Sequence, residues 1–248
     1  MKIIKYRKGT SGLYKVELDD GRVLSLYEDV ILKYELLLKR EILECDLYEI
    51  ENINREYEVY YVALKSIKSR FKSTYDVKEM LIKKEYPIDM IDKAIDKLEK
   101  QGYLNDRSFA KSYINNQIIT TTKGPNKIKK ELLEHRVEKN IIDEELTIFD
   151  EDTQLEKINK VAARLFRSNH TRGGMVLRRK IINDLVMMGY DSDLIDRIIN
   201  EFDFSSDKDL IKKEYDKLYK RLSKKYSGKE LEYKIKEKLY QKGLYYED

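Results

Sequence analysis

The chain has 248 residues, of which 41% are hydrophobic and 39% are charged, against a usual charged share of about 25%. With only 10 glycines and 2 prolines, it has little material for long irregular loops, so long amphipathic helices with heavily charged outer faces are expected. The net charge of +4 is too small to indicate nucleic-acid binding by itself. The single cysteine excludes an intramolecular disulfide and a cysteine-based metal cluster.

Membrane insertion and secretion are not expected from the hydropathy pattern. No run of about 18 apolar residues is present, and the N-terminal segment lacks the apolar core of a signal peptide. We therefore expect a cytoplasmic protein without a membrane partner.

Strand signals are confined to the first 27 residues. Residues 13–18 and 22–27 alternate in polarity on either side of a turn whose Gly21 can adopt a positive φ, which predicts a β-hairpin. Residues 3–6 can add a third strand. A small sheet needs a packing partner, and the apolar positions of a predicted helix over 28–39 supply one.

The first clear helical pair lies within residues 77–106. Pro87 reads as the start of the second helix, because proline is tolerated in a first helical turn, and Gly102 reads as its end. Between them, apolar side chains such as Ile91 and Ile95 recur at a spacing of three to four residues.

This pattern recurs along the chain. Four leucines recur at spacings of 51, 53 and 54 residues, namely Leu81, Leu132, Leu185 and Leu239. Five positions after each of them lies an aromatic or apolar residue. These followers are Tyr86, Val137, Tyr190 and Leu244. A period near fifty, with three helices per period, is typical of a helical repeat array. The expected buried core includes Leu81, Ile91, Ile95, Leu132, Ile142, Leu185 and Ile195.

The predicted fold is mainly α: an elongated array of three-helix repeats with a small N-terminal β-hairpin plus helix. An acidic connector over 41–58 leads into the repeats, and Asn105-Asp106 and Ser205-Ser206-Asp207 are candidate N-caps. The predicted domains are 1–57 (hairpin and helix), 58–105, 106–153 and 154–203 (three-helix repeats), and 204–248 (a partial fourth repeat).

Several short blocks resemble the RecX family, regulators of the RecA recombinase. They are Gly102-Tyr103-Leu104-Asn105-Asp106, Phe109-Ala110, Lys123-Gly124-Pro125, Glu131-Leu132-Leu133 and the basic turn Ser69-Arg70-Phe71-Lys72-Ser73. Their order and spacing cover about the whole chain. The small residue often found before the third helix of a repeat is Gly189 or Gly243 in the later repeats, but Glu85 and Arg136 in the first two. The chain also continues into a partial fourth repeat that shorter members lack.

Acidic residues are absent from one window in each repeat, namely 59–75, 107–130, 157–183 and 217–229. Each window spans the end of a first helix, the turn between the first and second helices (called the elbow below) and the start of the second helix. If elbows align in the array, their basic side chains form a cationic stripe suited to phosphates. The candidate residues for binding nucleic acid or a nucleoprotein filament are Lys65, Lys68, Arg70, Lys72, Lys111, Lys123, Lys127, Lys130, Arg164, Arg167, Arg172, Arg178, Arg179, Lys220 and Arg221.

Aromatic residues interleave with these basic windows. Tyr60, Tyr61, Phe71, Tyr75, Tyr113 and Phe166 could stack on bases, although filling a thin core is the commoner role of such residues. His135 is expected on the exposed side of a helix, and His170 lies in a basic turn that could touch phosphate.

Enzymatic chemistry has little support. No Walker-type phosphate loop is present, and two histidines leave little material for metal sites or serine–histidine relays. The cluster Asp150-Glu151-Asp152 is more typical of an acidic helix junction than of a metal site. We expect no enzymatic activity, no metal and no cofactor.

The resemblance implies a monomeric, non-enzymatic inhibitor of RecA. Its partners would be the RecA nucleoprotein filament, along whose groove it lies, and single- and double-stranded DNA, in recombination and DNA repair. Two alternatives stay open: a general nucleic-acid-binding repeat protein unrelated to RecA, and a protein-binding helical scaffold. Whether the basic stripe meets DNA or RecA is not decided by the sequence.

Overall fold

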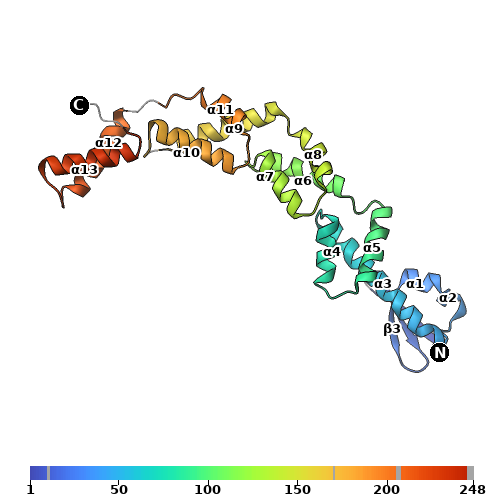
Figure 1. The fold of residues 1–248 in the computed structure, drawn as a ribbon. Helices are drawn as coiled ribbons and strands as arrows, with labels where there is room; N and C mark the ends of the chain where they lie inside the picture. The colour runs from blue at the N-terminus through green and yellow to red at the C-terminus, as the bar shows by residue number, and fades with distance from the viewer. Residues whose placement is uncertain (10–11, 170, 205–207, 245–248) are drawn as a thin grey trace. The chain divides into compact units, whose positions relative to one another are not determined.

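The computed structural model describes residues 1–9, 12–169, 171–204 and 208–244. The chain divides into two compact units, which we describe separately: residues 1–109 with 135–137, and residues 110–134 with 138–248. Apart from a small N-terminal sheet, the described residues are mainly helical, as predicted (Figure 1). None of the described helices combines the length and the apolar character that crossing a membrane requires.

The N-terminal residues form a three-stranded antiparallel sheet in the order β1-β2-β3. The strands are β1 (Ile3–Lys8), β2 (Leu13–Leu18) and β3 (Val23–Tyr27). Gly21 adopts a φ of 87° in the turn between β2 and β3, as the hairpin prediction required. The inward side chains Val16, Leu18 and Leu26 are buried, so the sheet has one apolar face that the following helices cover.

The prediction of a single helix over 28–39 is wrong. The chain forms two short helices, α1 (Glu28–Lys33) and α2 (Leu36–Lys39), because Glu35 adopts a left-handed φ of 52°. On a continuous helix Leu36 would lie about 140° around the axis from Ile31. The break lets both side chains enter the core beneath the sheet, where each is 2% exposed.

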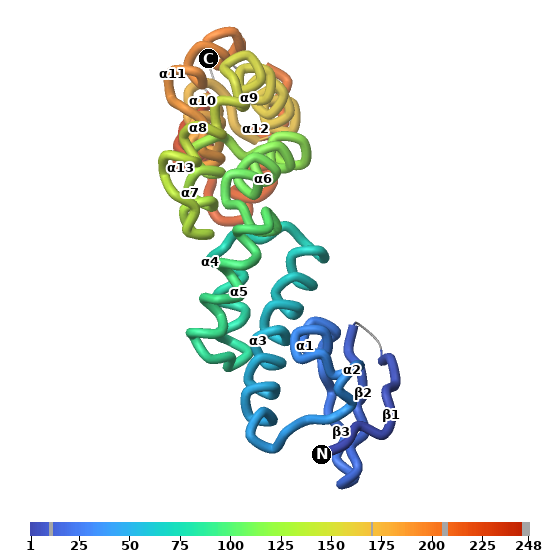
Figure 2. The backbone as a smooth tube through the Cα atoms, turned by 90° about the vertical axis from the view of Figure 1, so that its right-hand side faces the viewer, coloured from blue at the N-terminus to red at the C-terminus, as the bar shows by residue number. Residues whose placement is uncertain are grey.

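The acidic segment predicted as a connector is also helical. It forms the first half of α3 (Glu44–Ser69), a 26-residue helix that continues into the first repeat. Ile50 of α3 packs in the N-terminal core, whereas Val59 and Ala63 pack with α4 (Thr74–Ile82) and α5 (Ile88–Lys100). Figure 2 shows α3 passing from the sheet to α4 and α5. One helix therefore serves both cores of the first unit, and the boundary predicted near residue 57 falls inside it.

The remaining helices follow the predicted order of first, second and third helix. They are α6 (Asp106–Thr120), α7 (Pro125–Glu134), α8 (Lys139–Glu145) with a 3-10 turn at Leu146–Ile148, α9 (Glu151–Arg167), α10 (Gly174–Met187), α11 (Ser192–Ile199), α12 (Lys208–Leu222) and α13 (Gly228–Gln241). The side chain of Asn105 accepts a hydrogen bond of 2.9 Å from the Ser108 amide, as expected of a cap before α6. The cap predicted at Ser205-Ser206-Asp207 lies outside the described residues.

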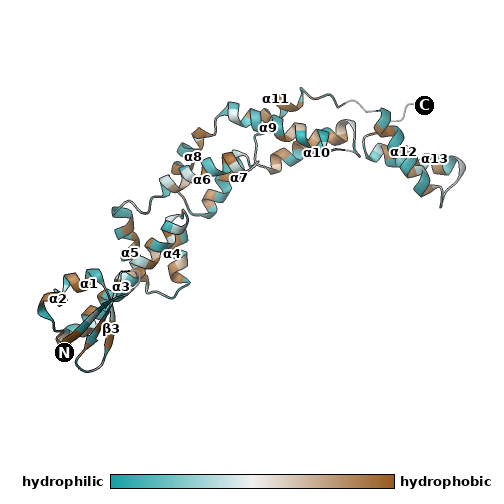
Figure 3. Ribbon diagram, turned by 180° about the vertical axis from the view of Figure 1, so that it is seen from behind, coloured by the Kyte–Doolittle hydropathy of each residue, from teal (hydrophilic) through white to brown (hydrophobic). Residues whose placement is uncertain are grey.

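The recurring leucines occupy equivalent places. Each lies within the last three residues of a second helix (α4, α7, α10 or α13), and each is at most 1% exposed. The rest of the predicted core is confirmed as buried: Ile91, Ile95, Ile142 and Ile195. Figure 3 shows the corresponding segregation, with hydrophobic and hydrophilic residues alternating along these helices as an amphipathic helix requires.

The residue four positions after each recurring leucine adopts a left-handed conformation. The φ values are 61° at Glu85, 57° at Arg136, 93° at Gly189 and 72° at Gly243. The turn after the second helix therefore has a left-handed residue at the same position in each repeat, whether or not that residue is a glycine.

Candidate nucleic-acid interface

In the second unit, the second helices of successive repeats meet end to end. At the N-terminus of α7, the Gly124 amide donates to the Met188 carbonyl at 2.7 Å, and the Asn126 amide donates to the Gly189 carbonyl at 3.0 Å. The same junction recurs at the N-terminus of α10, where the Gly173 amide donates to the Lys242 carbonyl at 3.0 Å. Helices α7, α10 and α13 thus follow one another (Figure 1).

Glycine is required at these junctions because backbone meets backbone. A Cβ atom on Gly189 would lie 2.5 Å from the Lys127 nitrogen, and one on Gly243 would lie 2.2 Å from the Gly173 oxygen. The first unit makes the equivalent junction with side chains: His135 Nδ1 lies 2.9 Å from Asp76 Oδ2, and Arg136 lies over the Tyr75 ring at 5.7 Å. His135 is therefore half-buried just after α7, and the prediction that it lies on the exposed side of a helix is wrong.

This junction fixes the spacing of the elbows. The elbow before α7 touches the C-terminal end of α10, and the elbow before α10 lies at the opposite end of the same helix. At about 1.5 Å per residue, the 14 residues of α10 separate successive elbows by about 21 Å. Basic side chains along the second helices must therefore fill the space between elbows if a cationic row is to be continuous.

Most of the predicted binding residues are exposed. The exceptions are Lys72, Lys123 and Arg178, which are half-buried. Lys123 forms an ion pair of 2.7 Å with Glu131, and Arg178 donates to Asn200 Oδ1 at 3.0 Å, so both have structural partners. The exposed members, none of which has an ion pair within the described residues, are Lys65, Lys68, Arg70, Lys111, Lys127, Lys130, Arg164, Arg167, Arg172, Arg179, Lys220 and Arg221.

Other basic residues of the same windows hold the fold. Lys129 is paired with Asp143, Lys180 with Asp184 at 3.0 Å, and Lys157 donates to the Thr121 carbonyl at 2.8 Å. Burial lowers the pKa of Lys157. The structure therefore separates the acid-free windows into internally satisfied cations and cations that remain available to a partner.

The carboxylate of Glu131 is held by two donors in the elbow of the second repeat. Burial alone would raise its pKa, but hydrogen bonds from Lys123 and from the Tyr113 hydroxyl, at 2.9 Å, outweigh burial and lower it. Burial and the bond to Glu131 in turn raise the pKa of Tyr113 to about 12. Glu131 is thus an ionised structural carboxylate that fixes the elbow.

The exposed face of the second helix differs in charge between repeats. On α10 it forms an open groove of about 520 Å³, lined by Arg172, Met175, Val176, Arg179, Lys180, Asn183, Asp184 and Tyr240. The corresponding groove on α4, about 540 Å³, is lined by Tyr75, Asp76, Glu79, Met80, Lys83 and Lys84. Arg179 and Lys180 of α10 stand where α4 has Tyr75 and Asp76, counted from the recurring leucine. The same surface is therefore basic in the third repeat and partly acidic in the first.

The aromatic residues proposed for base stacking are mostly core residues. Tyr61 stacks on Tyr27 with ring centroids 4.8 Å apart, and Phe166 packs on Phe202 at 5.6 Å. Tyr60 is buried and Tyr113 is hydrogen-bonded, so Phe71 (69% exposed) and Tyr75 (37%) are the exposed members of the predicted set. Sequence reasoning missed Tyr240, which is 67% exposed in the groove on α10, because a core role fits any aromatic residue on a repeat helix.

Two further predictions concern the elbows. His170, predicted to touch phosphate, lies outside the described residues. The acidic cluster at 150–152 is a helix junction, as expected: Asp150 caps α9 by accepting a 2.8 Å hydrogen bond from the Thr153 amide. Within the described residues no group of three or more histidine, cysteine or acidic side chains is arranged to hold a metal ion.

Comparison with known proteins identifies the family. Residues 105–146 match the model of the second three-helix domain of RecX. The regulatory protein RecX of Streptococcus sanguinis (strain SK36) is 30% identical over 253 residues, covering 100% of this chain and 96% of that protein. The chain belongs to the RecX family. The regulatory protein RecX of Listeria monocytogenes serotype 4a (strain HCC23) is 29% identical, covering 94% of this chain and 88% of that protein.

Solved RecX structures support the same assignment. A crystal structure of a regulatory protein RecX matches with a TM-score of 0.69 and 25% identity, covering 81% of this chain and 99% of that one. RecX from Lactobacillus salivarius matches with a TM-score of 0.57 and 27% identity, covering 60% and 97%. Membership of this family of regulatory proteins supports a role in regulating the RecA recombinase, and thereby in recombination and DNA repair.

Proposed function

We propose that this RecX chain is a non-enzymatic inhibitor of RecA that lies in the groove of the RecA–DNA filament, with its basic side chains facing DNA phosphates. The observation that carries the proposal is a set of exposed cations on consecutive second helices that form no ion pair with any described residue. Lys127 and Lys130 lie on α7, Arg179 lies on α10, and the glycine junction joins these helices end to end.

The spacing suits a nucleic-acid backbone. Phosphates of one strand are about 3.4 Å apart, so the 21 Å or so between successive elbows corresponds to about six nucleotides. Cations at the elbows and on the helices between them can follow one strand for that length. Each neutralised phosphate releases condensed counterions, which gives affinity without reading the base sequence.

Inhibition follows from occupancy of the groove. A row of repeats can contact several filament subunits and the DNA at once, and linked contacts raise avidity even when each is weak. A bound chain then excludes the second DNA molecule and opposes the movements of RecA that accompany ATP turnover. This mechanism needs no catalytic group in the inhibitor.

A charge-matched pair of variants tests the role of the basic row. The test variant is Lys127→Ala, Lys130→Ala and Arg179→Ala, and the control is Lys83→Ala, Lys84→Ala and Lys100→Ala, which removes the same charge from exposed positions of the first unit. At about 0.7–0.9 per phosphate contact, the test variant should lower the salt slope of DNA binding by about 2–3 and relieve inhibition of RecA ATPase and strand exchange. Unchanged inhibition by the correctly folded test variant would refute the electrostatic mechanism.

The groove on α10 gives the general nucleic-acid-binding alternative its support, since exposed Met175 and Tyr240 beside Arg179 resemble a stacking platform for a bare single strand. That alternative predicts that a bare oligonucleotide competes as well as a RecA-coated one for the chain. A preference for the RecA-coated strand at equal salt supports the RecA regulator.

A further inference from the structure

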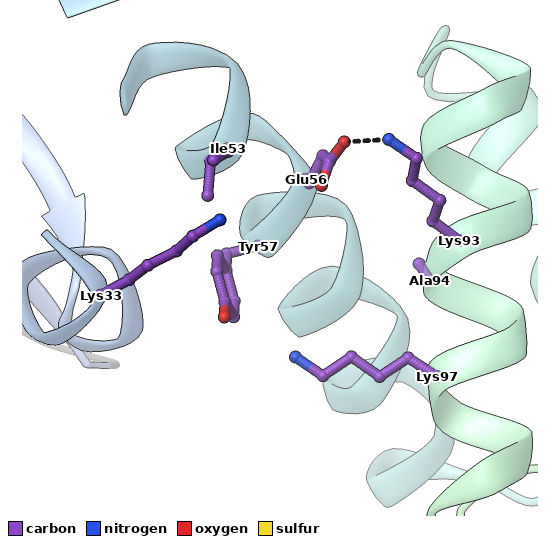
Figure 4. A pocket seen from close by; sticks show the side chains of 7 residues that line it. All are labelled: Lys33, Ile53, Glu56, Tyr57, Lys93, Ala94 and Lys97. Carbon is purple, nitrogen blue, oxygen red and sulfur yellow. Dashed lines mark hydrogen bonds and ion pairs between the residues drawn. The ribbon is translucent and has the colours of Figure 1, made fainter. Parts of the chain in front are cut away.

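The first unit contains a small basic pocket that belongs to none of the acid-free windows. It has a volume of about 150 Å³ and lies between α1, α3 and α5. Its walls are Lys33, Ile53, Glu56, Tyr57, Lys93, Ala94 and Lys97 (Figure 4).

The charges in this pocket are unbalanced. Three lysines face one carboxylate, and that carboxylate, Glu56, is already paired with Lys93. Lys33 and Lys97 have no ion pair within the described residues. Among the described residues the pocket therefore presents two ammonium groups that form no ion pair, and an anion would stabilise them.

The ammonium groups of Lys33 and Lys97 approach the same aromatic side chain from different helices. Figure 4 shows the side chains of Lys33, from α1, and Lys97, from α5, extending toward Tyr57 on α3. The Lys97 nitrogen lies 4.5 Å from the ring centroid of Tyr57 and 4.4 Å from that of Tyr60. Cation–π attraction of this kind holds the ammonium group at the pocket instead of letting it extend into water.

The surrounding packing keeps the pocket open. Tyr57 is supported from behind by Tyr61, whose ring centroid lies 6.5 Å away. Ala94 is 3% exposed and packs in the core of the first repeat, so α5 presents a methyl group where a larger side chain would fill the space. The position of the pocket is thus fixed by residues that are themselves part of the core.

Size and charge together define the ligand. Pockets for whole small molecules usually measure about 300–1,000 Å³, so 150 Å³ admits only one group of a larger partner or a small free ion. Lysine ammonium groups act as point charges on phosphate. Because Lys97 covers the Tyr57 ring, the pocket suits a phosphate and leaves no free aromatic face for a base.

We propose that Lys33, Lys93 and Lys97 form a phosphate-binding subsite in the first unit. The source of the phosphate is the backbone of a nucleic acid if the proposed function is correct, and a free phosphate ligand otherwise. The subsite would extend DNA contact to a part of the chain that the basic windows do not include.

Three full-length variants test the subsite. Lys33→Gln with Lys97→Gln removes both unpaired cations, Glu56→Gln releases Lys93 from its carboxylate, and Lys100→Gln is a control on α5 at a lysine that pairs with Asp96 outside the pocket. Binding of a fluorescent single-stranded oligonucleotide is measured against salt, and pyrophosphate binding is measured by calorimetry. Circular dichroism confirms that each variant folds.

We expect opposite effects from the first two variants. Loss of two phosphate contacts should lower the slope of log affinity against log salt for the single strand by about 1.4. The ratio of the original chain's affinity to that of the variant should therefore be roughly 25-fold larger at 0.1 M salt than at 1 M salt. Glu56→Gln should tighten binding, which a damaged fold would not do, and Lys100→Gln should change nothing. Reduced pyrophosphate affinity together with an unchanged oligonucleotide affinity would assign the subsite to a free ligand.

The proposal is overturned if the double variant binds both the oligonucleotide and pyrophosphate as the original chain does. It is also overturned if a polyglutamate peptide binds the pocket more tightly than either phosphate ligand, because that would indicate an acidic protein segment. Weaker phosphate binding with unaltered RecA inhibition would support the subsite and show that inhibition does not depend on it, whereas the proposed function is refuted only by the variant of Lys127, Lys130 and Arg179. The two proposals therefore fail separately.

Discussion

Replacing Gly189 tests whether the end-to-end junction positions the basic row. A Cβ atom there would lie 2.5 Å from the Lys127 nitrogen, and the φ of 93° is itself unfavourable for an L-residue. Left-handed backbone costs about 1–2 kcal/mol. The clash also separates α7 from α10 and removes two backbone hydrogen bonds, each worth about 0.5–1.5 kcal/mol. We expect Gly189→Ala to lower the free energy of unfolding of the second unit by about 2–5 kcal/mol.

The equivalent position of the first repeat provides a matched comparison. Glu85 also has a positive φ, 61°, but it carries a side chain. Glu85→Gly relieves about 1–2 kcal/mol of backbone strain. It also costs about 0.5–1 kcal/mol of stability, because glycine loses more conformational entropy on folding than other residues. The net effect should be a stabilisation of up to about 1.5 kcal/mol, opposite in sign to the effect at Gly189.

Urea unfolding combined with hydrogen exchange measures both effects. Repeat proteins need not unfold in one step, so exchange at the amides of α7 reports the junction directly. Because Lys127 moves with α7, Gly189→Ala should also weaken DNA binding without removing any charge. A free energy of unfolding within about 0.5 kcal/mol of the original value, with unchanged exchange on α7, would refute the steric argument.

Two further predictions concern the second unit. Leu185→Ala should cost about 2–5 kcal/mol by calorimetry, because Leu185 is fully buried, whereas Met187→Ala at a 77% exposed position should cost little; equal effects would contradict the assigned core. Burial would raise the pKa of Glu214, but its bond to Lys242 and nearby lysine charges outweigh burial and hold that pKa below its ordinary value of 4.5. A depressed carboxyl pKa contributes stability at higher pH that is lost as pH falls below about 4.5, so Glu214→Gln should flatten the acid limb of the stability curve.

The sequence predicted the repeat core because the period has a direct physical cause. A helix that packs on its neighbours needs apolar residues every three to four positions, and equal repeats place them at equal offsets. Leu81, Leu132, Leu185 and Leu239 satisfied both conditions and are all buried. Gly102 was likewise predicted to end its helix, and it adopts a φ of 74° just after the end of α5 at Lys100.

Features that depend on the backbone conformation of a single residue were harder to predict from the sequence. The break between α1 and α2 depends on a left-handed Glu35, a residue type with no preference for that conformation, so the 28–39 pattern looked like one helix. The acidic residues of 41–58 suggested a connector, but acidic residues also suit the first turn of a helix, and Ile50 and Ile53 supply the buried side of α3. Hydropathy alone could not separate these two possibilities.

At the candidate interface, the sequence could not distinguish basic side chains with internal partners from exposed ones. Windows without acidic residues identified Lys123 and Lys127 equally, yet only the three-dimensional contacts show that Lys123 is paired with Glu131 whereas Lys127 is exposed and has no ion pair within the described residues. A pocket assembled from α1, α3 and α5 gives no sequence signal at all, since Lys33 lies 60 residues before Lys93 and 64 before Lys97.

The charge pattern of the second helices has a consequence for how the chain would bind. A charge pattern that merely kept the protein soluble would have no reason to differ between equivalent surfaces. Yet the groove on α4 balances Lys83 and Lys84 with Asp76 and Glu79, and Asp76 also contacts His135 at the junction. The groove on α10 instead exposes Arg172 and Arg179. A surface with balanced charges gains little from phosphates, so the first unit would meet them at its exposed elbow cations, such as Lys65 and Arg70, and at the lysine pocket between α1, α3 and α5. The two proposals are therefore complementary: the second helices contribute cations in the second unit, and the lysine pocket adds to the elbow cations of the first.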